Sequence, residues 1–154
     1  MEELIKNLIL KNKTISTMES CTGGMICNEI TNIPNASKVF NFSAVTYSNE
    51  YKIKMGVKKE IIDKYSVYSK ETSIEMARVI SCFTNSNYGI GVTGKLKKKD
   101  ENNNYGPDDL VYLTIYDKDN DKVYSYVIEL MYDTRIENKK QILDFFVDKM
   151  LEIV

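Results

Sequence analysis

The stretch MESCTGG, residues 18 to 24, holds the side chains best suited to nucleophilic chemistry. Apolar and β-branched residues precede it and a helical pattern follows it, so we expect a strand to end there and a helix to begin near Gly23 and Gly24. Ser20 lies in the expected turn as a nucleophile or a cap, and either Ser20 or Thr22 should cap the helix. Backbone N–H groups at such a helix start could stabilise an oxyanion or hold an anion.

The absence of histidine narrows the chemistry that this serine could perform. It excludes Ser-His-Asp and Cys-His arrangements and the usual zinc sites. A serine hydroxyl then needs another base, and a lysine can accept its proton when burial or a nearby cation lowers the lysine pKa. Lys52 is our candidate, because it lies one turn into a helix expected to start near Ser48 and could reach Ser20. Tyr47 could donate or relay a proton to this pair.

Other interpretations of the same residues stay open. Cys21 could be the nucleophile, although only the helix start would lower the pKa of its thiol. Tyr47 could be an ordinary strand-end aromatic residue, and Glu19 is expected to be structural. Arg135 is in the first turn of the expected last helix, where its charge opposes the helix dipole, so it is a candidate anion-binding residue.

Composition excludes several classes of protein. The 154 residues fit one domain, expected to span residues 1–154. With a net charge of -1 the chain has no broad positively charged surface that could bind a nucleic-acid backbone. The basic cluster KLKKKD at 95–100 is expected to be a solvated loop. No apolar run approaches about 18 residues, so we expect no membrane span. Three cysteines without a CxxC spacing favour a reduced, cytoplasmic setting.

Hydrophobic periodicity predicts alternating helices and strands. Strands are expected at residues 14–18, 38–47, 88–93, 110–117 and 122–130. Helices are expected at residues 2–12, 23–33, 48–56, 58–65, 70–85 and from 134 onward. Helices between strands, followed by a hairpin, indicate a three-layer α/β/α sandwich with a mixed β-sheet. Ser20, Tyr47 and Thr93 each follow a strand, and the carboxyl ends of strands are where such sheets carry their sites.

Side-chain patterns within these elements give further expectations. Ser69 should cap the helix at 70–85, and Thr134 with Glu137 should form a capping box for the last helix. The buried stripe of the helix at 70–85 is expected to be Ile74, Ala77, Ile80 and either Cys82 or Phe83. Four side chains of the strand at 38–47 are expected to be buried: Val39, Phe42, Ala44 and Val45.

Four segments together resemble a known family. They are TISTMESCTGG, VFNFSAVTYSNEYKIKMGV, YSVYSKETSIEMA and GIGVTG, in that order along the chain. They resemble the C-terminal domain of CinA, the competence/damage-inducible proteins, a family also known as nicotinamide-nucleotide amidase. The resemblance covers about residues 4 to 94 closely and the remainder loosely, and ESCTGG with YSNE..K is specific to it.

The resemblance implies a three-layer α/β fold, often dimeric. It also implies hydrolysis of the carboxamide of nicotinamide mononucleotide, a small-molecule substrate, to nicotinic acid mononucleotide and ammonia in pyridine-nucleotide salvage. By the resemblance, Ser20 is the nucleophile, Lys52 its base and Tyr47 a supporting proton donor. Neither a metal nor an organic cofactor is implied. The residues that would surround the substrate are Thr22, Gly23, Gly24, Thr93 and Arg135.

The chain departs from the family pattern after VTG. The family usually continues VTGIAGP and later PVGTVY, whereas this chain reads VTGKLKKKDENNNYGPDDLVYL, with Asp109 and Leu110 before VY. YDTR replaces the usual GDR, and the second arginine one turn on corresponds to Lys139. Larger CinA proteins also carry an N-terminal domain, and we expect this chain to be the stand-alone form.

The departures at 94–110 leave two further hypotheses beside the nucleotide amidase. One is a Ser-Lys amidase for another small amide. The other is a non-catalytic binding or regulatory module with the same fold. A lysine amine within hydrogen-bond distance of the serine hydroxyl would favour either enzyme, and a 94–110 segment that fills the cleft would favour the module.

Overall fold

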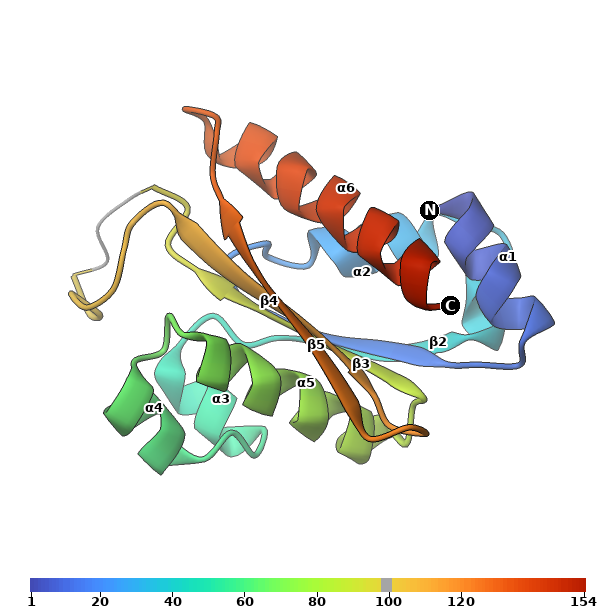
Figure 1. Cartoon of the computed structure of the whole chain (residues 1–154), viewed down its shortest axis with the longest axis horizontal. Helices are drawn as coiled ribbons and strands as arrows, with labels where there is room; N and C mark the ends of the chain where they lie inside the picture. Colours follow the sequence, from blue (N-terminus) through green and yellow to red (C-terminus); the bar gives the residue numbers. More distant parts are fainter. Residues whose placement is uncertain (98–100) are drawn as a thin grey trace.

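A five-stranded mixed sheet lies between two layers of helices (Figure 1). The structure is a computed structural model that describes residues 1–97 and 101–154. One helical layer contains α1, α2 and α6, and the other contains α3, α4 and α5. The three-layer α/β/α sandwich expected from the sequence is therefore confirmed.

The order of elements follows the predicted alternation of helices and strands. The strands are β1 (Ile15–Glu19), β2 (Phe40–Val45), β3 (Tyr88–Gly94), β4 (Leu110–Asp117) and β5 (Lys122–Glu129). The helices are α1 (Glu2–Leu10), α2 (Met25–Thr31), α3 (Asn49–Lys54), α4 (Lys59–Tyr65), α5 (Lys70–Thr84) and α6 (Arg135–Ile153), with the 3-10 turn η1 (Ala36–Lys38) before β2.

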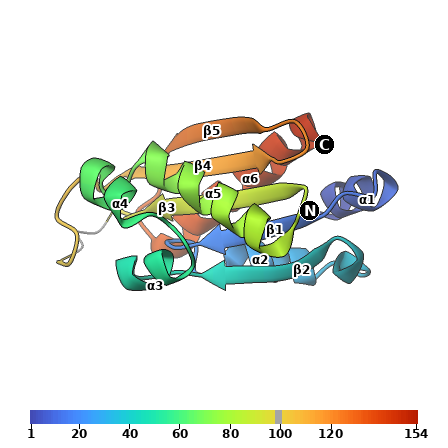
Figure 2. The same cartoon turned by 90° about the horizontal axis from the view of Figure 1, so that it is seen from below.

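The sheet order explains where a site can form. The strands lie in the order β2-β1-β3-β4-β5, as Figure 2 shows from below. β1 pairs in parallel with both β2 and β3, whereas β4 and β5 form an antiparallel hairpin against β3. The carboxyl ends of β2, β1 and β3 therefore meet at one edge of the sheet, which brings the segments after Glu19, Val45 and Gly94 together.

Two apolar cores hold the layers on the sheet. The larger core joins the sheet to α1, α2 and α6, and the smaller one joins it to the helices of the opposite face. On the second face α5 lies directly against β3, because a Cβ atom at Gly89 would lie 2.1 Å from the Ala77 carbonyl and one at Gly91 would lie 2.2 Å from the Ser73 carbonyl. Glycine at these positions permits the close approach of helix and strand.

The predicted helix caps Ser69 and Thr134 are confirmed, and of the two candidates at the start of α3, Ser48 and Asn49, the cap is Ser48. The hydroxyl of Ser48 accepts a hydrogen bond from a backbone N–H in the first turn of α3, and Ser69 does the same for α5. At α6 the Thr134 hydroxyl accepts from the backbone N–H of Glu137. These caps define where α3, α5 and α6 begin, and the start of α3 matters most because it positions Lys52.

Burial predictions for β2 and α5 are wrong at several positions. Phe42 and Val45 are 38% and 50% exposed, because β2 is an edge strand whose pairing register with β1 shifts near its start and breaks the regular alternation. Cys82 and Phe83 are also exposed. The buried stripe of α5 includes small polar residues that a hydrophobic pattern misses: Thr72, Ser73, Met76, Ala77, Ile80 and Ser81.

Candidate active site

The turn that carries Ser20 links β1 to α2. Gly23 and Gly24 adopt positive φ values of 64° and 91°, a conformation that glycine enters without steric cost. Gly24 is the N-cap residue of α2, so the prediction that Ser20 or Thr22 caps this helix is wrong. The turn instead leaves the Ser20 side chain at the carboxyl end of β1, where it lines a cavity.

The helix start is capped by a carboxylate from the strand. Glu19 is fully buried, and its two oxygens accept hydrogen bonds from the backbone N–H groups of Ile26 (3.1 Å) and Cys27 (2.8 Å). A carboxylate near a helix N-terminus also interacts favourably with the helix dipole. Glu19 is thus structural, as expected, and it fixes the two ends of the turn that holds Ser20.

Lys52 reaches Ser20 in the structure. The Lys52 Nζ atom lies 3.0 Å from Ser20 Oγ and 2.6 Å from the carbonyl oxygen of Thr46. Both side chains are buried, with Lys52 only 1% exposed and Ser20 5% exposed. The Thr46 carbonyl orients the lysine amine toward the serine. The geometry thus brings the candidate nucleophile and the candidate base into hydrogen-bond distance.

A cavity of about 550 Å³ lies beside this pair. Its volume falls within the range of about 300–1,000 Å³ that small-molecule sites occupy. Three segments after the parallel strands contribute most of the wall. The lining residues are Ser20, Cys21, Tyr47, Ser48, Asn49, Tyr68, Gly94, Lys95, Asn102, Asn103 and Arg135. The described part of the 94–110 segment therefore forms part of this wall, and the cavity stays open beside it.

Tyr47 and Arg135 meet at the rim of the cavity. The Tyr47 side chain is 67% exposed, and its hydroxyl oxygen accepts a 3.3 Å hydrogen bond from Arg135 Nη2. Arg135 Nη1 donates to the carbonyl oxygen of Lys95 at 3.5 Å. Arg135 thereby links the segment after β2, the segment after β3 and the start of α6, and it brings a positive charge to the cavity.

Two threonines expected near the substrate are buried behind the cavity wall. Thr93 is fully buried, and its hydroxyl donates to the carbonyl of Val67 at 2.9 Å. Thr22 is 1% exposed, and its hydroxyl has no hydrogen-bond partner among the residues that the structure describes. Neither residue belongs to the cavity lining. In this arrangement both can act on a ligand only through their neighbours or after a small shift.

The geometry also bears on Cys21 as an alternative nucleophile. Burial raises the pKa of the Cys21 thiol to about 12, against smaller opposing effects from its neighbours, Lys52 among them. Because the thiolate is the reactive form, a protonated thiol is a poor nucleophile near pH 7. Ser20, with Lys52 beside it, is the better candidate.

The expectation of a solvated loop at 95–100 is wrong for Lys95. Its side chain is 2% exposed, and Nζ donates to the Gly106 carbonyl at 2.9 Å and to the Asp108 carboxylate at 3.0 Å. Lys97 is exposed as expected, whereas residues 98–100 lie outside the described residues. No local pattern marks Asn49, Asn102 or Asn103 as residues that line the cavity, because only the fold brings their segments to it.

Within residues 1–97 and 101–154, no three His, Cys, Asp or Glu side chains gather as metal ligands. None of the helices in that part of the chain combines the length and the apolar character needed to cross a bilayer.

Comparison with known proteins identifies the family of this chain. The sequence profile of the CinA C-terminal domain matches residues 1–154. The chain belongs to the CinA C-terminal domain family. The family resemblance seen in the four sequence segments is thus confirmed over the whole chain.

Relatives and solved structures agree with this assignment. A competence-damage inducible protein of Clostridium botulinum (strain Langeland) is 48% identical over 96 residues, covering 61% of this chain and 24% of the relative. One of Clostridium kluyveri is 43% identical over 125 residues, covering 80% of this chain and 30% of the relative. This CinA-family chain thus spans less than a third of the length of these two relatives.

A crystal structure of a CinA superfamily protein from Klebsiella pneumoniae 700603 has the same fold. It superposes with a TM-score of 0.89 at 20% sequence identity, and the match covers 98% of this chain and 92% of that one. At this identity the likeness concerns the CinA fold alone.

Proposed function

We propose that this chain hydrolyses the carboxamide of nicotinamide mononucleotide to nicotinic acid mononucleotide and ammonia. The observation that carries the proposal is the 3.0 Å contact between Lys52 Nζ and Ser20 Oγ, both buried beside a cavity of about 550 Å³. Membership of the CinA family supports it. The resemblance of the segments ESCTGG and YSNE..K to that family assigns the roles of nucleophile, proton donor and base to Ser20, Tyr47 and Lys52. The proposed reaction is acyl transfer through a serine ester.

In the first step Lys52, as the neutral amine, accepts the hydroxyl proton of Ser20. The serine oxygen bonds to the carboxamide carbon, and the C=O π electrons move to the oxygen. The turn supplies backbone N–H donors for this oxyanion, since in the described part of the chain those of Thr22 and Gly24 have no acceptor. The Thr46 carbonyl holds Nζ in place while the amine gains its proton.

In the second step the C–N bond breaks and ammonia leaves with the proton that Lys52 carried. The neutral Lys52 then takes a proton from water, and the resulting hydroxide attacks the ester. The C–O bond to Ser20 breaks, the serine regains a proton from Lys52, and the carboxylic acid product passes its own proton to the released ammonia, so that a carboxylate and an ammonium ion depart. Tyr47 is the alternative donor of the one proton that the leaving amine needs; its hydroxyl must then turn from Arg135 toward that amine, and Lys52 returns a proton to it.

The nucleotide part of the substrate would extend toward the rim. Arg135 carries the charge that a 5′-phosphate requires, and its planar guanidinium can donate two parallel hydrogen bonds to phosphate oxygens. We assign Thr93 an indirect role, because its hydroxyl ties the end of β3 to the Val67 carbonyl beneath the site.

A second candidate is a Ser-Lys amidase that acts on another small amide. The wall of the cavity favours it, since Lys95, Asn102 and Asn103 stand where the family sequence differs most. The third hypothesis, a non-catalytic module, has less support. The 101–109 segment lines the cavity without filling it, and the lysine and serine remain in hydrogen-bond distance.

Ammonia release from nicotinamide mononucleotide tests the proposal. The parent chain should release ammonia, and Ser20→Ala and Lys52→Met should each lower kcat by at least about 100-fold, as expected for loss of a nucleophile or its base. Lys54→Met on the same helix is the matched control, because its side chain is 58% exposed and its partners, Glu50 and the ring of Tyr51, both lie at the surface. It should keep parental activity.

The other outcomes discriminate among the three hypotheses. Faster ammonia release from a different amide in a panel would favour the second candidate. If the folded parent chain releases ammonia from no amide in the panel, the non-catalytic binding module is the hypothesis that remains.

A further inference from the structure

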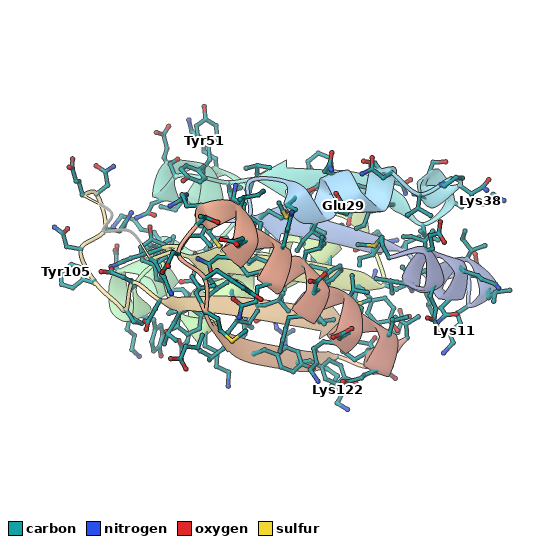
Figure 3. All side chains as sticks on the ribbon, turned by 90° about the horizontal axis from the view of Figure 1, so that it is seen from above. Lys11, Glu29, Lys38, Tyr51, Tyr105 and Lys122 are labelled. Atoms are coloured by element: carbon teal, nitrogen blue, oxygen red, sulfur yellow. The ribbon has the colours of Figure 1, made fainter. Side chains whose placement is uncertain are left out.

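Amide side chains gather on the wall of the cavity. Asn49 comes from the first residue of α3, whereas Asn102 and Asn103 come from the segment between β3 and β4. Asn49 Nδ2 donates to Asn103 Oδ1 at 2.8 Å, so the two segments meet although 54 residues separate them. Figure 3 shows that Tyr51 and Tyr105, from the same two segments, point away from the molecule. The asparagines, and not these tyrosines, face the cavity.

Lys95 fixes the segment that presents two of these amides. Its buried ammonium group binds the Gly106 carbonyl and the Asp108 carboxylate, so the chain returns to the end of β3 just after the asparagines. The Lys95 Nζ atom also lies 5.4 Å from the ring centroid of Tyr68, another lining residue. A buried ammonium with oxygen partners holds its segment firmly, because losing them would leave a desolvated charge.

The chemistry of this wall differs from that of the rim. A carboxamide offers both N–H donors and a carbonyl acceptor without net charge. Sugar hydroxyls, which also donate and accept, match such groups, whereas a phosphate needs cations and donors, which Arg135 provides. The wall and the rim therefore suit two different parts of one ligand.

We propose that Asn49, Asn102 and Asn103 form an amide wall that recognises the ribose hydroxyls of the substrate. This inference rests on the proposed function for the identity of the substrate. It adds the identity of the residues that bind the ribose hydroxyls. Asn102 and Asn103 stand in the part of the chain that departs from the family pattern, whereas Asn49 belongs to the YSNE segment that resembles the family, so the contribution of Asn102 and Asn103 belongs to this chain's own sequence.

Binding of two ligands that differ only in the sugar hydroxyls tests the amide wall. The ligands are nicotinamide mononucleotide and its 2′,3′-dideoxy analogue, titrated by calorimetry into the whole chain carrying Ser20→Ala to prevent turnover. We expect the ribose form to bind about tenfold more tightly, as two neutral hydrogen bonds would give. Asn103→Ala and Asn49→Ala, each made separately, should reduce this affinity ratio to about 3-fold or less. Each should weaken binding of the ribose form and leave binding of the dideoxy analogue unchanged.

Asn104→Ala is the matched control, because Asn104 is exposed and outside the cavity lining, and it should keep the full ratio. Two variants on different elements guard against a local folding defect in one of them. Three outcomes would overturn the proposed role of the amide wall. They are equal affinity for the two ligands, an affinity ratio that both variants leave unchanged, and binding of neither ligand.

The outcomes also separate this inference from the proposed function. Ammonia release by the parent with an unchanged binding ratio would refute the wall alone. A hydroxyl-dependent affinity without ammonia release would refute the amidase and keep the wall.

Discussion

The buried carboxylate of Glu19 accepts a 2.8 Å hydrogen bond from the backbone N–H of Cys27 across the turn that carries Ser20. A second oxygen accepts from Ile26, and the hydroxyl of Thr17 donates to the same carboxylate at 3.3 Å. The last residue of β1 thus holds the first turn of α2. This contact fixes the geometry of the turn from both ends, so the position of the Ser20 hydroxyl depends on a side chain outside the cavity.

Replacing Glu19 by glutamine should loosen this turn. The amide keeps one acceptor but places an N–H₂ group against a backbone N–H donor, which leaves a buried donor unpaired. We expect Glu19→Gln to lower the free energy of unfolding by about 1–3 kcal/mol, measured by urea denaturation. If the proposed function holds, kcat should fall as well, because a shift of the nucleophile costs rate.

Glu29→Gln is the control for this substitution. Glu29 lies on the same short helix, and among the described residues its side chain accepts only from the Asn28 side chain, at an exposed position. Its replacement should change stability by less than about 0.5 kcal/mol. Equal stability of the two variants would contradict the capping role of Glu19.

Replacing Lys95 by methionine should affect substrate binding more than chemistry. The substitution removes the ammonium that joins Gly106 and Asp108, while Lys52 and Ser20 keep their contact. In steady-state assays of ammonia release, we expect KM to rise about tenfold and kcat to stay within about twofold, as for loss of an interaction that acts on binding alone.

Lys97→Met serves as the comparison, since Lys97 is exposed two residues further along the chain. It should leave both constants unchanged. A fall in kcat with constant KM in Lys95→Met would show that Lys95 acts on the reaction and not on the wall.

The cysteines should differ sharply in reactivity toward iodoacetamide. Cys82 is exposed, whereas Cys21 is buried and its pKa is raised to about 12, so its thiolate is scarce at pH 8. Peptide mass spectrometry after brief labelling of the folded chain should find Cys82 modified and Cys21 unmodified. Rapid labelling of Cys21 at pH 8 would argue for a reactive thiol and revive Cys21 as a candidate nucleophile.

The same thiol should contribute to alkaline instability. From its ordinary pKa of 9.0 up to about 12, the unfolded chain loses the Cys21 proton while the folded chain keeps it. The unfolded state then binds fewer protons, so the free energy of unfolding falls as pH rises through this window. Cys21→Ala should reduce this pH dependence, measured by urea denaturation between pH 8 and pH 11. An unchanged slope would show that other groups dominate.

Local sequence patterns predicted most of the fold and the centre of the site. Period-2 and helical patterns located the strands and helices, and Ser48 marked the start of α3, from which the position of Lys52 followed. The absence of histidine, with a serine before two glycines, pointed to a Ser-Lys pair. These signals are local, since they depend on neighbouring residues and on the geometry of a single helix or strand.

Long-range contacts account for what the sequence did not predict. Lys95 is a charged residue in a polar run, and its burial depends on a carboxylate thirteen positions along the chain. Phe42 became exposed because β2 lies at the sheet edge, which no pattern within the strand reveals. The helix cap also came from Glu19, on the preceding strand, and not from the turn itself.

The sequence by itself determined the alternation of elements, the capped helix starts and the residue types available for chemistry, because these follow from neighbouring side chains and backbone hydrogen bonding. The tertiary structure alone decided that Lys52 Nζ lies 3.0 Å from Ser20 Oγ, that Tyr47 pairs with Arg135 and that asparagines line the cavity. These contacts join segments that meet only when three parallel strands end at one edge of the sheet. Their geometry depends on packing across the whole domain.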